Sequence, residues 1–188
     1  VIDSNDKAHI VFYRDDNSNL MYSTNKTGSW VTSSIETSNN VGKYCNLAID
    51  SNDGLHVSYQ YNSGNALRYA YKSASSSSWS TTTIDNTGGK FTSIALDSND
   101  KPHFAYRDSG GDLGYAEKTG GSWSFSAVQS VGDTAFTSIA IDSNDDIHIA
   151  YYDANIKDMF HLTDTSGSWV RTTLEDIGSN TGGTSLDI

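Results

Sequence analysis

One segment recurs four times along the chain and limits what it can fold into. It reads IDSND at residues 2–6, 49–53 and 141–145 and LDSND at 96–100, and the register returns at Ile188. The spacings are 47, 47, 45 and 47 residues, so four periods account for all 188 positions. We therefore predict a single domain over 1–188, built of four repeats that begin near residues 2, 49, 96 and 141.

Each repeat has the pattern of four short strands separated by Gly, Ser and Asn. The first strand is expected at 44–50, 91–97 and 136–142, and the second at 9–13, 56–60, 103–107 and 148–152. The third is expected at 20–23, 67–72, 113–118 and 159–164, and the fourth runs from a Ser-Trp turn to Ile35, Ile84, Val128 or Leu174. No segment shows helical periodicity over a helix length.

Four strands in about 47 residues are typical of a β-propeller blade. The predicted fold class is therefore all-β, either a closed four-bladed ring or four blades of a larger or oligomeric ring. A β-solenoid is the alternative, although its coils are usually shorter. The second strands alternate, and one face is apolar: Ala8, Ile10, Phe12; Leu55, Val57, Tyr59; Pro102, Phe104, Tyr106; Ile147, Ile149, Tyr151. We expect that face to pack on the next sheet, with the four tryptophans (30, 79, 123, 169) between blades.

The recurring Asp-Ser-Asn-Asp segment has two interpretations. Asp3 and Asn5 imitate the start of a calcium loop, whose closing carboxylate stands at position 12. That position holds Arg14 in the first repeat, and the intervening strand would carry it roughly 20 Å away at ~3.3 Å per residue. We therefore predict a hairpin turn, in which Asp accepts backbone N–H groups and an Asn, Asp or Gly adopts positive φ. No cofactor is predicted, and calcium is the less favoured interpretation.

A histidine follows each of these turns: His9, His56, His103 and His148. A residue present once per blade serves the blade or a multivalent site, whereas a catalytic histidine is normally unique. We expect each imidazole to bond the turn aspartate or the backbone and so hold the hairpin. A zinc site would require the four histidines to converge.

Charge and composition exclude several classes of partner. The net charge is −11 with a pI near 4.6 and no Lys/Arg cluster, which disfavours nucleic acids and anionic membrane surfaces. No apolar run approaches the roughly 18 residues of a membrane span. Cys45 is the single cysteine, so an internal disulfide is excluded.

The D-S-N-D-x-x-H turn, the tyrosine near the end of the second strand and the G-S-W turn together resemble repeats of bacterial secreted β-propellers of the Asp-box (BNR-like) kind. The blade length is also that of tachylectin-type lectin propellers. The resemblance covers the whole chain and implies an extracellular or cell-surface protein. An Asp-box has the pattern Ser-x-Asp-x-Gly-x-x-Trp, whereas residues 23–30 (STNKTGSW) lack the aspartate. The resemblance therefore implies an architecture and no activity.

Enzymatic residues are not marked out by the pattern. Glycoside hydrolysis needs two carboxylates across a cleft, and a sialidase-like site needs an arginine cluster with a Tyr/Glu pair. The four arginines lie at unequal positions in four repeats: Arg14, Arg68, Arg107 and Arg171. No acid/base pair is singled out, so an enzyme is the less favoured class, and neither catalytic residues nor metal ligands are predicted.

The repeats differ most where the second strand ends and in the turn that follows it. The strand ends carry Tyr13, Gln60, Arg107 and Tyr152, and the turns carry Asp16, Asn62, Asp108 and Asp153. Aromatic faces stack on sugar rings, while amides and carboxylates bond sugar hydroxyls. We predict these eight as ligand-binding residues, with a solvated loop rim as the alternative.

Three functions remain open at this point. The first is a secreted carbohydrate-binding propeller with several weak, similar sites for a glycan or polysaccharide. The second is a structural or protein-interaction module of a large surface protein. The third is a fragment of a glycosidase or polysaccharide lyase. Since an unclosed ring leaves strand edges exposed, further copies of the chain are also candidate partners.

Overall fold

A computed structural model describes residues 1–38, 40–165, 167–176 and 184–186, which contain 15 strands and no helix. The strands form one three-stranded and three four-stranded antiparallel sheets, each a meander of consecutive strands.

Blade 1 holds β1 (His9–Arg14), β2 (Asn19–Thr24) and β3 (Val31–Glu36). Blade 2 holds β4 (Val41–Ile49), β5 (Leu55–Tyr61), β6 (Ala66–Lys72) and β7 (Ser80–Asp85). Blade 3 holds β8 (Gly88–Leu96), β9 (Pro102–Asp108), β10 (Leu113–Thr119) and β11 (Ser122–Gln129). Blade 4 holds β12 (Thr134–Ile141), β13 (Ile147–Asp153), β14 (Asp158–Asp164) and β15 (Val170–Asp176).

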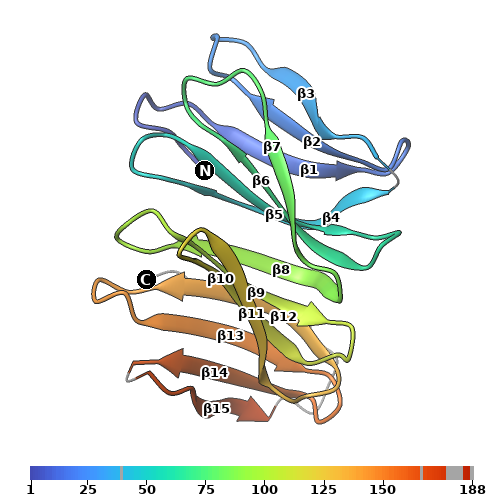
Figure 1. Cartoon of the computed structure of the whole chain (residues 1–188), viewed down its shortest axis with the longest axis vertical. Helices are drawn as coiled ribbons and strands as arrows, with labels where there is room; N and C mark the ends of the chain where they lie inside the picture. The colour runs from blue at the N-terminus through green and yellow to red at the C-terminus, as the bar shows by residue number, and fades with distance from the viewer. Residues whose placement is uncertain (39, 166, 177–183, 187–188) are drawn as a thin grey trace.

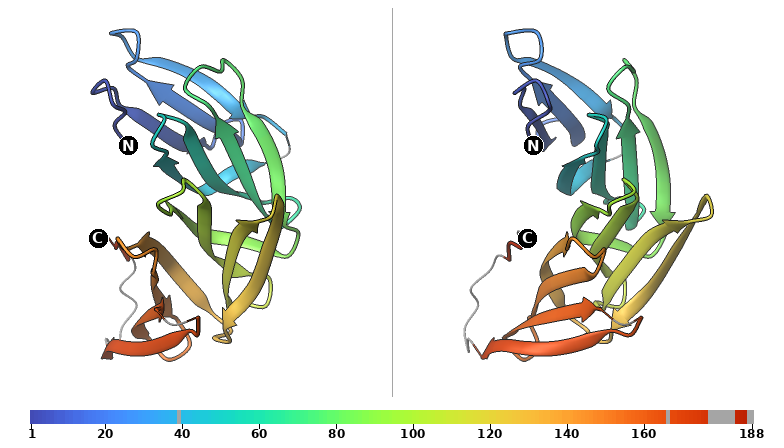
Figure 2. Two further views of the ribbon diagram at one scale, coloured as in Figure 1. Left: turned by 60° about the vertical axis from the view of Figure 1, so that its left-hand side comes forward. Right: turned by 90° about the vertical axis from the view of Figure 1, so that its left-hand side faces the viewer.

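The four blades follow one another along an open arc (Figure 1). Figure 2 shows the N-terminus and the described segment 184–186 on the concave side of this arc. The all-β propeller architecture predicted from the repeat is therefore confirmed, with blades that the described residues do not close into a ring.

Three apolar clusters hold the blades together, one at each junction between consecutive blades. Leu20 of blade 1 packs with Val57 and Tyr59 of blade 2. Similar clusters join blade 2 to blade 3 and blade 3 to blade 4. The side chains that the sequence placed on the apolar face of the second strand are buried in blades 2 to 4, as predicted.

Blade 1 departs from that prediction. Ile10 is 48% exposed and Trp30 is 55% exposed, although both were predicted to pack between sheets. The prediction was wrong for these two residues because no sheet covers that face of blade 1 in the described part of the chain. The three other tryptophans are partly buried and pack edge-on against a tyrosine of the preceding blade, as Trp123 does against Tyr69.

The Asp-Ser-Asn-Asp segments form hairpin turns, as predicted. Asp3 Oδ1 accepts the backbone N–H groups of Asn5 at 2.9 Å and Lys7 at 2.8 Å. The second aspartate of each segment adopts the left-handed conformation, with φ between 59° and 64°. Asn and Asp tolerate that conformation better than other non-glycine residues, which accounts for the residue at the fourth position.

The same turns also connect neighbouring blades. Ser4 donates from its backbone N–H and its hydroxyl to Asp53 of the next turn, at 2.8 and 2.5 Å. Ser51 and Asp100 repeat this pair at the next junction, and Ser98 and Asp145 repeat it at the third. The motif therefore both closes each hairpin and joins it to its neighbour.

Candidate functional site

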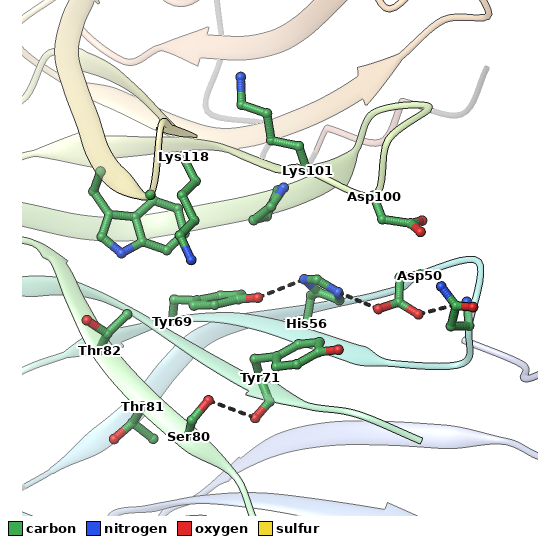
Figure 3. Close-up of a pocket in the computed structure, with 14 residues that line it drawn as sticks. Asp50, His56, Tyr69, Tyr71, Ser80, Thr81, Thr82, Asp100, Lys101 and Lys118 are labelled. Carbon is green, nitrogen blue, oxygen red and sulfur yellow. Dashed lines mark hydrogen bonds and ion pairs between the residues drawn. The ribbon is translucent and has the colours of Figure 1, made fainter. Parts of the chain in front are cut away.

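Next to each of these turns, three side chains contact one another in series, an arrangement that we call the relay. In blade 2, His56 Nε2 lies 3.1 Å from Asp50 Oδ2, and His56 Nδ1 lies 2.8 Å from the Tyr69 hydroxyl (Figure 3). Blades 1 and 3 contain the same relay: Asp3, His9, Tyr22 and Asp97, His103, Tyr115. The predicted imidazole–carboxylate contact is confirmed, whereas the tyrosine on the other ring nitrogen was not predicted.

Blade 4 replaces this tyrosine with a second histidine. His148 Nδ1 lies 2.9 Å from His161 Nε2, and the two rings stack with an interplanar angle of 12°. Asp142 lies 3.8 Å from His148. Burial lowers the pKa of His161, and the neighbouring His148 lowers it further.

The relay in blade 2 keeps its carboxylate ionised and its imidazole neutral. Burial raises the pKa of Asp50, but hydrogen bonds from His56 and from the backbone of Gly54 and Asn52 outweigh it, so the net pKa is lowered. Burial lowers the pKa of His56, and Asp50 offsets only part of that shift. Burial raises the pKa of the Tyr69 hydroxyl. Asp50, His56 and Tyr69 therefore hold one another in fixed positions, with the charged Asp50 at the turn, near the surface.

A hollow of about 780 Å³ opens beside this relay, between blades 2 and 3. It lies at the end of the sheets that carries the Asp-Ser-Asn-Asp turns, which we call the DSND rim. Blade 2 contributes Asp50, Asn52, His56, Tyr69, Tyr71, Ser80, Thr81 and Thr82, and blade 3 contributes Asp100, Lys101, Pro102, Lys118, Gly121 and Trp123.

Two aromatic side chains and several polar groups face this hollow. The Tyr71 ring is partly exposed and lies 4.8 Å from His56 at an angle of 61°. The Trp123 ring packs edge-on against the Tyr69 ring, and the Lys118 ammonium lies 5.7 Å from the centre of the Trp123 ring. Hydroxyls of β7 and the Asp100 and Lys101 side chains complete the wall (Figure 3). Aromatic faces combined with a few converging polar groups are typical of a small-ligand site.

Tyr71 is the residue that distinguishes this junction. Its equivalents are Thr24 in blade 1, Glu117 in blade 3 and Thr163 in blade 4. This departure is visible in the aligned repeats, so it is the sequence signal that could have indicated the hollow.

The eight predicted ligand residues lie at the other end of the sheets, which we call the opposite rim. Two of them, Tyr13 and Asn62, meet at the junction of blades 1 and 2. The Tyr13 hydroxyl donates to Asn40 Oδ1 at 3.0 Å, and Asn62 donates to the same oxygen at 3.0 Å. Gln60 is only 3% exposed, yet Gln60 and Asn62 both line a second hollow of about 470 Å³ with Lys43, Tyr44, Asn65 and Lys90.

The other five predicted residues do not converge. Arg107 pairs with Asp133 at 2.5 Å. Asp108 and Asp153 accept backbone N–H groups of their own turns. Tyr152 is buried, and the Asp16 side chain is 78% exposed with Arg14 at 4.0 Å. The repeat position therefore brings together only the residues of one junction.

No protein-family model and no curated protein matches the chain. Solved structures match its fold at low sequence identity. SapL1 lectin, in a complex with α-methyl fucoside, aligns over 93% of this chain and 61% of its own, with 13% identity and a TM-score of 0.71. Aleuria aurantia lectin, as an N224Q mutant with Fucα1-6GlcNAc, aligns over 92% of this chain and 62% of its own, with 14% identity and a TM-score of 0.61. The exo-β-1,3-galactanase 1,3Gal43A from Clostridium thermocellum aligns over 92% of this chain and 47% of its own, with 10% identity and a TM-score of 0.59.

These matches establish the propeller fold, and the chain spans less than two thirds of each neighbour. Within the described residues, no helix has the length and apolarity needed to cross a membrane.

Proposed function

We propose that this chain is a secreted or surface carbohydrate-binding propeller that takes a sugar in the hollow between blades 2 and 3. The observation that carries the proposal is the pairing of Tyr71 and Trp123 with hydroxyl and charged groups in one hollow of about 780 Å³. A sugar presents an apolar ring face to aromatic side chains and hydroxyls to polar ones. The fold shared with SapL1 and Aleuria aurantia lectin supports this choice of ligand class.

The polar groups of the hollow suit a hydroxylated ligand. Asp100 accepts from Ser51, and Lys101 forms an ion pair with Glu117, so both are held in position. Ser80 donates to the Tyr71 carbonyl at 3.2 Å, which ties β7 to β6 beside the hollow. We infer that the ligand hydroxyls would exchange hydrogen bonds with Asp100, Lys118 and the threonines of β7.

We propose two weak sites with different linings on this chain, in place of the similar site in every repeat that the sequence predicted. A shallow site of this kind would bind at about millimolar, near −4 kcal/mol, and several sites on one chain would raise the avidity. The hollow at the opposite rim, with Gln60, Asn62 and Tyr13 beside it, is the second proposed site.

The test is a glycan array that includes fucosides, followed by titration calorimetry with the best glycan. We expect at least one glycan to bind, and substitution Tyr71→Ala to weaken it. Absence of binding to every glycan, with and without calcium, would refute the proposal.

The fold shared with 1,3Gal43A supports a second candidate, a glycoside hydrolase fragment. Release of reducing sugar from a polysaccharide panel would favour it over the lectin. A structural or interaction module, the third candidate, predicts neither sugar binding nor hydrolysis.

A further inference from the structure

The hollow at the opposite rim carries a charge that is unusual for this chain. The chain has 23 acidic and 12 basic residues, yet this hollow of about 470 Å³ is lined by two lysines, three amides and one tyrosine, with no carboxylate among them. The lining residues are Lys43, Tyr44, Gln60, Asn62, Asn65 and Lys90. All six belong to blades 2 and 3, each of which has a further blade on either side.

The two lysines occupy equivalent positions in their blades. Lys43 of β4 and Lys90 of β8 both lie beside a β-bulge of the inner strand. Neither forms an ion pair with a carboxylate of the described residues. Lys90 is exposed, and the Lys43 ammonium lies 5.4 Å from the centre of the Tyr13 ring. Both positive charges therefore remain available to a ligand.

An aromatic ring supplies the apolar part of the hollow. Tyr44 and Phe91 follow the two lysines and adopt the left-handed conformation, with φ of 53° and 52°. Bulges of this kind re-aim the side chains that they carry. The Tyr44 ring is 41% exposed and lies 4.7 Å from the Phe91 ring. It therefore offers a face on which a sugar ring can stack.

The amides of the hollow are held in place by hydrogen bonds. Gln60 is 3% exposed, and its Nε2 donates to Asn65 Oδ1 at 3.3 Å. Asn62 Nδ2 donates to Asn40 Oδ1 at 3.0 Å. Amide groups both donate to and accept from hydroxyls, so they suit the neutral part of a sugar, whereas the lysines suit an anionic substituent.

We propose that the opposite-rim hollow takes an acidic sugar, a uronate whose carboxylate binds Lys43 and Lys90 and whose ring stacks on Tyr44. This inference rests on the proposed function, that the chain binds sugars, and adds the ligand class of this hollow. The net charge of −11 acts against an anion at long range. Charges beyond about 8 Å are largely screened at physiological salt, so the two lysines at the site dominate.

The hollow at the DSND rim is less suited to an anion. Asp50 and Asp100 both line it, and one of its two lysines, Lys101, is paired with Glu117. The two hollows should therefore differ in their preference for charge, which makes the two sites separable by ligand.

The test is an NMR titration of isotope-labelled protein with uronates, each compared with its neutral counterpart: glucuronate with glucose, and galacturonate with galactose. We expect at least one uronate to bind about fivefold more tightly than its counterpart, since each of two exposed ion pairs contributes modestly. The side-chain amide signals of Gln60 and Asn62 should shift on binding. Raising NaCl from about 50 to about 500 mM should weaken uronate binding and leave binding of the neutral sugars unchanged.

Charge variants locate the site. Lys90→Met keeps most of the side-chain length and should weaken uronate binding by about twofold to threefold, whereas Lys90→Arg keeps the charge and should retain it. Lys43→Met combined with Lys90→Met should abolish the preference for uronates. Lys157→Met is the matched control, since it makes the same change in net charge in the turn between β13 and β14, outside the hollow. It should leave binding unchanged.

Uronates that bind no more tightly than their neutral counterparts would overturn the proposal, as would equal weakening by Lys90→Met and Lys157→Met. Neutral glycans that bind and respond to Tyr71→Ala, without any preference for uronates, would refute the acidic ligand alone and leave the proposed lectin function intact. Absence of binding to every sugar would refute both.

Discussion

The two rims of the propeller use their variable residues differently. At the DSND rim, a repeated frame of Asp50, His56 and Tyr69 supports one departure, Tyr71, which faces a hollow. At the opposite rim, several variable residues bond to their own turns or to neighbouring side chains, as Asp108 and Arg107 do. The proposed binding positions are therefore the variable residues that line a hollow, Tyr71 at the DSND rim and Gln60 and Asn62 at the opposite rim.

The largest expected difference concerns the tryptophans that the repeat makes equivalent. Trp123→Ala should cost about 3 kcal/mol of unfolding free energy, because Trp123 packs on Tyr69 and Phe104 at a blade junction. Trp30→Ala should cost less than about 0.5 kcal/mol at concentrations where the chain is a monomer. Urea unfolding of the two variants measures this difference. Equal losses would show that blade 1 is covered as the other blades are.

The next difference separates the aspartates of the two rims. Asp50→Ala should cost roughly 2 kcal/mol, because it leaves His56 and two backbone N–H groups without their acceptor. Asp16→Ala should leave the unfolding free energy unchanged, since the Asp16 side chain is exposed to solvent. Thermal or urea unfolding compares the two. A similar loss in both variants would contradict a structural role for Asp50 that Asp16 lacks.

Acidification should act on the buried histidines of blades 2, 3 and 4. Burial lowers the pKa values of His56, His103 and His161 in the folded protein. The unfolded chain therefore takes up protons first as the pH falls below about 6.5, so stability present above that pH is lost below it. We expect the melting temperature to fall by a few degrees, roughly 2–4 °C, between pH 7 and pH 5.

His161→Tyr restores the residue that blades 1 to 3 carry and should reduce this fall. The variant removes the His161 imidazole, whose pKa is lowered by burial and by the neighbouring His148. Melting curves at pH 7 and pH 5 for both proteins provide the comparison. An unchanged or larger fall in the variant would exclude His161 as a source of acid sensitivity.

The sequence predicts the repeat, the strands and the turns because these depend on local patterns. Period-2 alternation and Asp-rich turns suffice to place β5 and the hairpin at Asp50. The tyrosine partner of His56 depends on cross-strand register, since Tyr69 lies diagonally across β6. The hollow depends on how far blade 3 stands from blade 2, which no pattern within one repeat encodes. The prediction that Trp30 lies between blades was wrong because the repeat makes the four tryptophans equivalent and does not show which blade lies at an end of the arc.

The most direct test of the account asks which rim binds the sugar. The best glycan from the array would be titrated against the unchanged protein, Tyr71→Ala at the DSND rim and Asn62→Ala at the opposite rim, with thermal melting to show that each variant is folded. We predict that Tyr71→Ala weakens binding by about tenfold, near 1.4 kcal/mol, and that Asn62→Ala changes it less. Unaltered binding by folded Tyr71→Ala, together with loss of binding in Asn62→Ala, would contradict a site between blades 2 and 3.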